Sequence, residues 1–172
     1  VGGRIGYDDD GNTPNTQVVF LKYEKAPVIF EVRGLPRDKA AQEKWGGAEM
    51  DEYHGQKIGV IIHCKNGTMT LSSNYGKVRA FDLEGNEVKS WQGNADHYAN
   101  FIDAVRSRKS TDLAADIHEG HISSAMCHLG NISYRTGRRL LFDGKTERFV
   151  NDDQANGMLA REYRKGSELP QI

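Results

Sequence analysis

Short, mostly hydrophobic stretches recur through the first ninety residues between polar, turn-rich segments, and they are rich in β-branched and aromatic side chains. Such stretches, separated by turn residues, are typical of strands. We predict three hairpins, in which residues 16–23 pair with 27–32, 57–65 with 68–72, and 78–82 with 88–91. Asn66-Gly67 joins the second hairpin, and this pair favours a type I′ turn because both central residues need a positive φ. Residues 38–53 lack clear periodicity and are predicted to form a long excursion.

The period of the pattern changes after residue 95. Four apolar residues recur at i, i+3, i+4 and i+7, which predicts a helix over residues 96–108; they are Tyr98, Phe101, Ile102 and Val105. A second helix is predicted to open at Asp116, where Glu119 three residues later resembles a capping box. Its end is expected near Gly137, since glycine is the usual residue just after a helix.

The last forty residues predict a hairpin and a final helix. Residues 140–142 and 147–150 flank Asp143-Gly144, a turn pair. Asp152 or Asp153 is then expected to cap a last helix that runs to about Arg164.

Strands that precede helices predict an α+β fold, here a single domain over residues 1–172 with an open, mostly antiparallel sheet covered on one face by two or three helices. We see no internal repeat. Residues 17–21 are apolar at nearly every position, as expected of a strand covered on both faces. Helices that cover only one face would leave an apolar patch of a size that monomers rarely expose. The chain is therefore expected to form a homo-oligomer through its sheet.

Composition narrows the functional classes. The 23 basic and 24 acidic residues among 172 give a net charge of −1, so no nucleic-acid partner is expected. No apolar run approaches the length that spans a bilayer, so no membrane partner is expected either. Residues 1–4 lack an initiator Met and the basic and apolar regions of an export leader. We therefore expect a piece of a longer protein, and its compartment, cytoplasmic or periplasmic, stays open.

Metal and disulfide chemistry receive little support. Two cysteines, Cys64 and Cys127, cannot build a disulfide framework, and both lie in apolar patterns where buried free thiols are common. A zinc site made of these two with His121 and His128 has no chelating spacing. The acidic run at residues 8–10 is interpreted as a solvated loop rather than a cation site, because it does not match the spacing of an EF-hand. No metal site is predicted.

The common complete active sites are also missing. The sequence contains no Gly-x-Gly-x-x-Gly between a strand and a helix, no P-loop, no Gly-x-Ser-x-Gly, no His-Glu-x-x-His and no pair of Cys-x-x-Cys units. We therefore expect that this chain alone does not bind a nucleotide cofactor and does not hold a complete set of catalytic residues.

The second predicted helix carries the most informative pattern. At about 100° per residue, five hydrogen-bonding residues fall within an arc of roughly 80°; they are His121, Ser124, His128, Asn131 and Arg135. An adjoining arc of roughly 120° is apolar and holds Ile122, Ala125, Met126, Leu129 and Ile132. Lys and Glu usually fill a solvated helix face, so the polar arc indicates a pocket wall or an interface. The alternative is a set of satisfied or partly exposed polar residues at a domain contact.

Several stretches resemble one protein family. They are residues 2–16 (GGRIGYDDDGNTPNT), 30–36 (FEVRGLP), 99–106 (ANFIDAVR), 119–135 (EGHISSAMCHLGNISYR) and 161–165 (REYRK). Together they resemble the bacterial branch of the glucose-fructose oxidoreductase, inositol dehydrogenase and MocA (Gfo/Idh/MocA) family. The resemblance covers nearly the whole chain, and it corresponds to the C-terminal domain.

The resemblance implies more than the pattern does. Family members have an N-terminal Rossmann domain that binds NAD or NADP, and a C-terminal domain whose sheet shapes the substrate site and often pairs subunits. The family's glycine-rich loop, its catalytic lysine and its Asp and His pair would lie upstream of Val1, so no catalytic or cofactor-binding residue is carried over. The resemblance places the polar helix face near the cleft between the two domains. It implies part of an NAD(P)-dependent oxidoreductase acting on a sugar or cyclitol; the alternative is a non-catalytic ligand-binding or dimerisation module.

Overall fold

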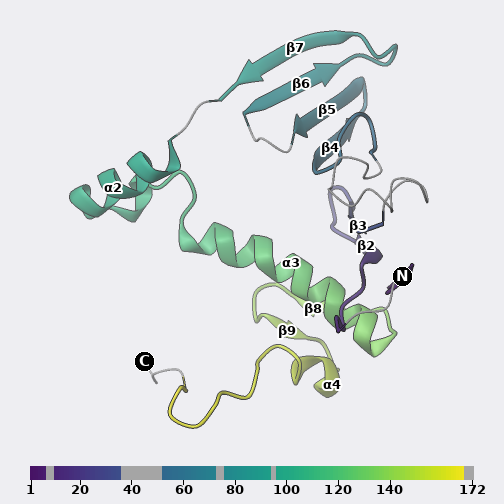
Figure 1. The fold of residues 1–172 in the computed structure, drawn as a ribbon, viewed down its shortest axis with the longest axis vertical. Coiled ribbons are helices and arrows are strands. Elements are labelled where there is room, and N and C mark those ends of the chain that lie inside the picture. Colours follow the sequence, from purple (N-terminus) through teal and green to yellow (C-terminus); the bar gives the residue numbers. More distant parts are fainter. Residues whose placement is uncertain (7–9, 36–51, 73–75, 94–95, 169–172) are drawn as a thin grey trace. The chain divides into compact units, whose positions relative to one another are not determined.

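The structure is a computed structural model that describes residues 1–6, 10–35, 52–72, 76–93 and 96–168. The chain forms two compact units, one made of residues 3–116 and the other of residues 117–172 with Val1 and Gly2. Figure 1 shows the elements in chain order. Most of the predicted excursion, and two of the three acidic residues at 8–10, lie outside the described residues.

The first sheet has three strands in the order β1-β2-β3, namely β1 (Gly2–Gly3), β2 (Thr16–Leu21) and β3 (Val28–Arg33). Strands β2 and β3 are antiparallel, with Val19 opposite Phe30. The predicted first hairpin is thereby confirmed. The loop before β2 is held by the buried side chain of Asn15, whose amide accepts from the backbone N–H of Ile5 and donates to its carbonyl oxygen, at 3.0 and 2.8 Å.

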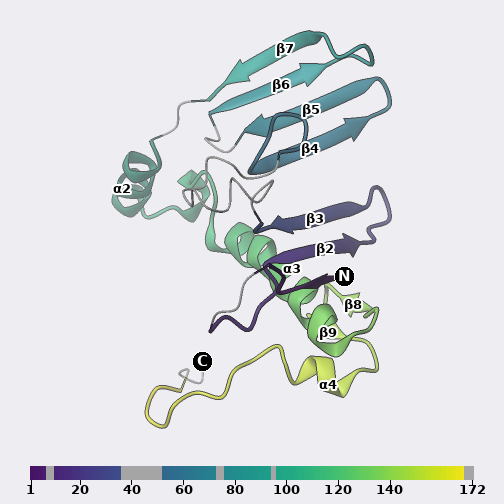
Figure 2. The ribbon, with the colours of Figure 1, turned by 45° about the vertical axis from the view of Figure 1, so that its right-hand side comes forward.

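The second sheet has four strands in the order β4-β5-β6-β7, drawn as a meander in Figure 2. They are β4 (Gly59–Cys64), β5 (Gly67–Ser72), β6 (Lys77–Phe81) and β7 (Glu87–Gln92). Every neighbouring pair is antiparallel, which confirms the second and third predicted hairpins. The β6–β7 turn is closed by Asp82, whose carboxylate accepts from the backbone N–H of Asn86 at 2.8 Å.

The turn between β4 and β5 differs from the prediction. Cys64 pairs with Gly67, so the two turn residues are Lys65 and Asn66 rather than Asn66 and Gly67. Neither turn residue has a positive φ, whereas Gly67 has a φ of 151°. A Cβ atom on Gly67 would overlap the carbonyl oxygen of Phe81. The glycine is needed for the close approach of two backbones, and the predicted type I′ turn is wrong.

Helix α2 (His97–Ser107) confirms the first predicted helix. The carboxylate of Asp96 caps it by accepting from the backbone N–H groups of Tyr98 and Ala99, and Arg108 ends it in the left-handed conformation. The side chain of Asn100 holds the following 3-10 turn, η1 (Ser110–Asp112), against the helix: it donates to the carbonyl of Asp112 at 2.7 Å.

The second unit is built around α3 (Ile117–Thr136). The helix begins directly after Asp116 and ends before Gly137, whose φ of 65° confirms its predicted role as the residue after the helix. A hairpin of β8 (Phe142–Asp143) and β9 (Arg148–Phe149) follows, as predicted.

The last helix is much shorter than predicted. Helix α4 covers only Asp153–Asn156; Asp152 is its N-cap and Gly157 its C-cap. The prediction that it extends to Arg164 is wrong. The backbone of Gly157 ends the helix early, and residues 161–164 are exposed, so no apolar contact in the described part compensates for the cost of ordering further turns.

The predicted α+β class is confirmed, since the described residues form antiparallel sheets and three α-helices. In the described residues the strands are divided among three sheets. The helical cover of one sheet face stays a prediction. Both cysteines are free, but Cys64 and Cys127 are exposed rather than buried. Cys64 is the last residue of β4, and Cys127 lies about 140° around α3 from Ile132, which is on the buried side of that helix.

Candidate functional site

All five predicted site residues lie on α3, so the helix brings them to one face. The face is arranged along about four turns, from His121 near the start to Arg135 in the last turn. The hydroxyl of Ser124 donates back to the helix, to the carbonyl oxygens of Gly120 at 2.8 Å and His121 at 3.1 Å. Hydroxyl groups often bond to the preceding turn in this way, so Ser124 still offers its lone pairs as acceptors.

The apolar face of α3 is only partly as predicted. Ile132 is buried and packs with Phe149 and Ala155 in a small core, to which Leu129, Leu140 and Phe142 add partly buried side chains. Ile122, which lies ten residues before Ile132 near the start of the helix, is 46% exposed. The core therefore lies along the C-terminal half of α3, where the β8–β9 hairpin and α4 cover it.

His121 lies at the border between the two faces and meets a carboxylate from the hairpin. Its Nε2 atom is 2.9 Å from Oε1 of Glu147. Both side chains are about half exposed, at 52% and 55%. A carboxylate only accepts hydrogen bonds, so Nε2 is the donor and Nδ1 of the neutral ring remains an acceptor.

Asn131 carries the other unusual feature of the polar face. Its Oδ1 atom is inaccessible to solvent and has no hydrogen-bond partner among the residues described. A buried amide oxygen without a donor is costly, since it loses water without replacement. His128, one turn away on the same face, is exposed. The middle of the polar face thus offers an acceptor that needs a donor from outside the described residues.

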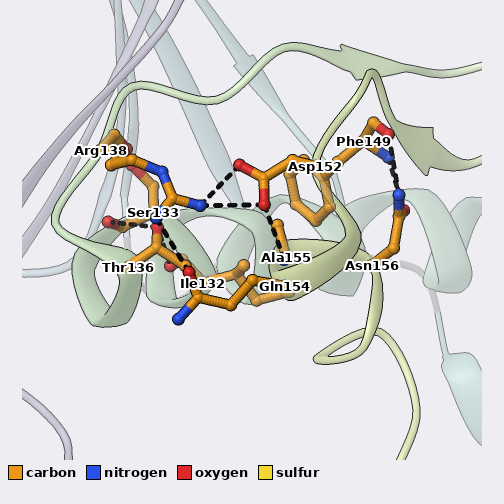
Figure 3. Close-up of polar contacts among 9 residues, drawn as sticks. All are labelled: Ile132, Ser133, Thr136, Arg138, Phe149, Asp152, Gln154, Ala155 and Asn156. Carbon is orange, nitrogen blue, oxygen red and sulfur yellow. Dashed lines mark hydrogen bonds and ion pairs between the residues drawn. The ribbon is translucent and has the colours of Figure 1, made fainter.

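The packing of the hairpin and α4 on α3 is reinforced by polar contacts (Figure 3). The guanidinium of Arg138 donates to both carboxylate oxygens of Asp152, at 2.9 and 2.7 Å, and to Oε1 of Gln154 at 2.9 Å. The same carboxylate accepts from the backbone N–H of Ala155 at 3.0 Å. These bonds, led by the one from Arg138, lower the pKa of Asp152 below its ordinary value. Asn156 completes the contact by bonding both backbone groups of Phe149 at 2.9 Å.

The described residues contain no group of three or more His, Cys, Asp or Glu side chains placed to hold a metal ion. Likewise, none of the described helices is long and apolar enough to cross a membrane.

One residue of the site is absent from the sequence prediction. The sequence pattern predicts a strand at Glu147, and nothing in its sequence neighbourhood links it to His121, 26 residues earlier. The contact arises because the hairpin folds back onto α3. Its one local indication, a left-handed backbone at a glutamate, is visible only in the structure.

The comparisons with known proteins decide the family. Residues 10–169 match the family described as "Oxidoreductase family, C-terminal alpha/beta domain", which is the C-terminal domain of the Gfo/Idh/MocA oxidoreductases. The chain belongs to this family. No curated protein and no solved structure matches it.

Membership in the Gfo/Idh/MocA family implies an N-terminal Rossmann domain as partner. A Rossmann cradle needs a parallel strand, a glycine-rich turn and a helix N-terminus that faces the pyrophosphate. In the described residues the pairs β2–β3, β4–β5, β5–β6, β6–β7 and β8–β9 are all antiparallel. The described residues therefore do not fit a dinucleotide cradle.

Proposed function

We propose that this chain is the substrate and oligomerisation domain of an NAD(P)-dependent oxidoreductase that transfers hydride to or from a carbon of a sugar or cyclitol. The family match over residues 10–169 is the observation that carries the proposal. In enzymes of this kind the cofactor performs the redox step, and the protein orients the substrate. The Rossmann domain would hold NAD or NADP, and the present chain would hold the polyol.

The polar face of α3 supports the role in substrate or interdomain contact. His121, Ser124, His128, Asn131 and Arg135 offer both donors and acceptors, which is what recognition of several hydroxyl groups requires. Asn131 adds a specific reason, because its buried Oδ1 has no donor in the described structure. A substrate hydroxyl or an N–H group of the Rossmann domain would satisfy it.

A role in subunit pairing rests on the second sheet. One row of cross-strand neighbours is entirely apolar, namely Val60, Leu71, Val78 and Trp91. The next row on the same face is Ile62, Met69, Ala80 and Lys89. Three of the apolar side chains in these rows are more than 40% exposed, Val60 at 53%, Ile62 at 44% and Trp91 at 42%. A sheet face of this kind is typical of an interface, and we propose a second copy of the chain as its occupant.

The same observation favours the second candidate, a non-catalytic dimerisation or ligand-binding module. A fold can persist after its redox chemistry is lost, so family membership does not by itself establish turnover.

An activity screen separates the two candidates. The full-length protein is mixed with NAD or NADP and a panel of sugars and cyclitols, and the appearance of reduced nicotinamide is followed by absorbance. Reduction with at least one polyol is the expected result. Binding of a polyol without any reduction or oxidation of either cofactor would contradict the enzyme and favour the module.

A further inference from the structure

Glu147 adopts a backbone conformation that disfavours its side chain. Its φ is 52°, in the left-handed region that glycine and asparagine occupy most readily. Asn151, four residues later, has a φ of 53° and follows this preference. A glutamate in the same conformation is unusual, and such positions are often kept for function.

The hairpin turn does not need the Glu147 side chain. Asp143 closes the turn: its Oδ1 accepts from the backbone N–H of Lys145 at 2.9 Å, and its Oδ2 accepts from the hydroxyl of Thr146 at 3.0 Å. The Glu147 carboxylate instead points to α3 and meets His121. Its described interaction is thus with a residue of the polar face and not with the turn in which it stands.

The contact between Glu147 and His121 determines which hydrogen-bonding groups of the imidazole remain available. With Nε2 donating to the carboxylate at 2.9 Å, the neutral His121 ring keeps Nδ1 as a hydrogen-bond acceptor. Among the residues described, the ring makes no other hydrogen bond. An acceptor of this kind suits a hydroxyl group, whose proton it can receive in a hydrogen bond.

We propose that Glu147 is a positioning residue that fixes the orientation and tautomer of His121, so that Nδ1 accepts a hydrogen bond from a hydroxyl group of the bound polyol. The identity of the ligand rests on the proposed function. The role of Glu147 toward His121 rests on the contact and on the backbone of Glu147. Such an orienting carboxylate is a common second partner of functional histidines.

Two variants separate this role from a structural one. Glu147→Gln keeps the size of the side chain, but its amide can donate to Nε2 as well as accept from it. Glu147→Gly removes the side chain and suits the left-handed backbone. Lys145→Gln, in the same turn, is the control, because the Lys145 contact that closes the turn uses its backbone N–H.

The first measurement is nitrogen NMR of the histidine rings in the full-length protein, at a pH where the rings are neutral. We expect His121 to be an Nε2–H tautomer with a slowly exchanging proton in the wild type and in Lys145→Gln. In Glu147→Gln and Glu147→Gly that protected proton should be lost. Equal spectra in the wild type and the two Glu147 variants would overturn the proposal.

The second measurement uses the polyol identified in the activity screen. Glu147→Gly should raise KM about tenfold, as expected for loss of one oriented hydrogen bond, with kcat largely kept. Its melting temperature should stay equal or rise, because the strained backbone is relieved. In a His121→Asn background the Glu147→Gly change should have no further effect on KM. A lower melting temperature with an unchanged KM would show a structural residue and contradict the proposal.

The two measurements also keep the two proposals apart. If the screen finds no polyol that is turned over, the proposed function fails, and the NMR spectra still decide whether Glu147 positions His121.

Discussion

The two compact units differ in what they bury. In the described part of residues 117–172 the buried side chains are apolar, namely Ile132, Phe149 and Ala155. In the described part of residues 3–116 the buried side chains are Asn15, Gln17 and Thr70, together with the small Ala104. The unit of residues 117–172 has a small hydrophobic core of its own. In the described part of residues 3–116 the strands are joined by backbone ladders, and several large apolar side chains are exposed, among them Phe20 and Ile58.

This difference follows from the strand pattern. The row of Val60, Leu71, Val78 and Trp91 is entirely apolar, whereas a row on the other face of the four-stranded sheet combines Ile61 with Thr70, Arg79 and Ser90. Apolar burial is the main source of stability in folding and association. We therefore propose that the apolar face of the four-stranded sheet serves association, whereas the small core of the α3 unit serves folding.

The largest effect should come from Phe149→Ala. Phe149 is 3% exposed and meets the ring of Phe142 edge to face, with 5.2 Å between centroids. Loss of the buried ring and the resulting cavity should cost about 3 to 5 kcal/mol in the free energy of unfolding, measured by urea denaturation. Val60→Ala, on the exposed sheet face, is the control and should cost under about 1 kcal/mol in a monomer. Equal losses would refute the contrast between the two units.

A smaller effect is expected from Leu129→Ala, since this side chain is only partly buried against the core. We expect a loss of about 2 kcal/mol, at the low end for a leucine in a core. His128→Ala, its exposed neighbour, should cost under about 1 kcal/mol. Thermal melting of both variants measures the difference; a His128 variant as unstable as Leu129→Ala would show that this histidine is a core residue.

The next prediction concerns acid stability. Because hydrogen bonds from Arg138 and from the backbone of Ala155 lower the pKa of Asp152, its charged form favours the folded state. This contribution is fully present above the ordinary aspartate value of 3.8 and is lost as the pH falls through the lower folded-state pKa. Asp152→Asn should therefore lower the melting temperature at neutral pH and approach the wild type in strong acid. A difference that stays constant from neutral pH to strong acid would exclude this role of the ion pair.

The smallest effect on folding, but a clear one on assembly, is expected from a charge on the apolar sheet face. Ile62→Lys places an ammonium group among Val60, Met69 and Leu71, where it can still reach water because Ile62 is 44% exposed. The wild type should be a dimer or larger by light scattering at tens of micromolar, and the variant a monomer with a similar melting curve. A monodisperse wild-type monomer would contradict association through this face.

Local patterns predicted most of the secondary structure. The strands of all four hairpins follow from stretches of β-branched and aromatic residues, helix α2 follows from its apolar periodicity, and the end of α3 before Gly137 follows from the preference for glycine there. The position of the β4–β5 turn could not be predicted from such local preferences. Gly67 is needed because the backbone of β6 passes close to it, not because of the turn. This close approach depends on a strand that begins ten residues further along the chain.

For the candidate site, the sequence predicts which residues share a face of α3, but not their contacts in space. Helical periodicity places His121 and Asn131 on one face of α3, but it cannot show that a buried Asn131 oxygen lacks a donor. The partner of His121 was also hidden, because Glu147 reaches it through the folding of the hairpin. Exposure of Cys64 and Cys127 was missed for a similar reason: an apolar neighbourhood in sequence is not burial in space.

The most direct test of the central claim compares stability with activity in the full-length protein for three neighbouring variants of α3: Leu129→Ala, His128→Ala and Asn131→Ala. If the polar face serves ligand or interdomain contact, kcat/KM should fall most in the His128 and Asn131 variants, about tenfold or more, while melting falls most in Leu129→Ala. If kcat/KM instead follows the melting temperature across the three variants, the polar face has only a structural role and the proposed function of α3 is wrong.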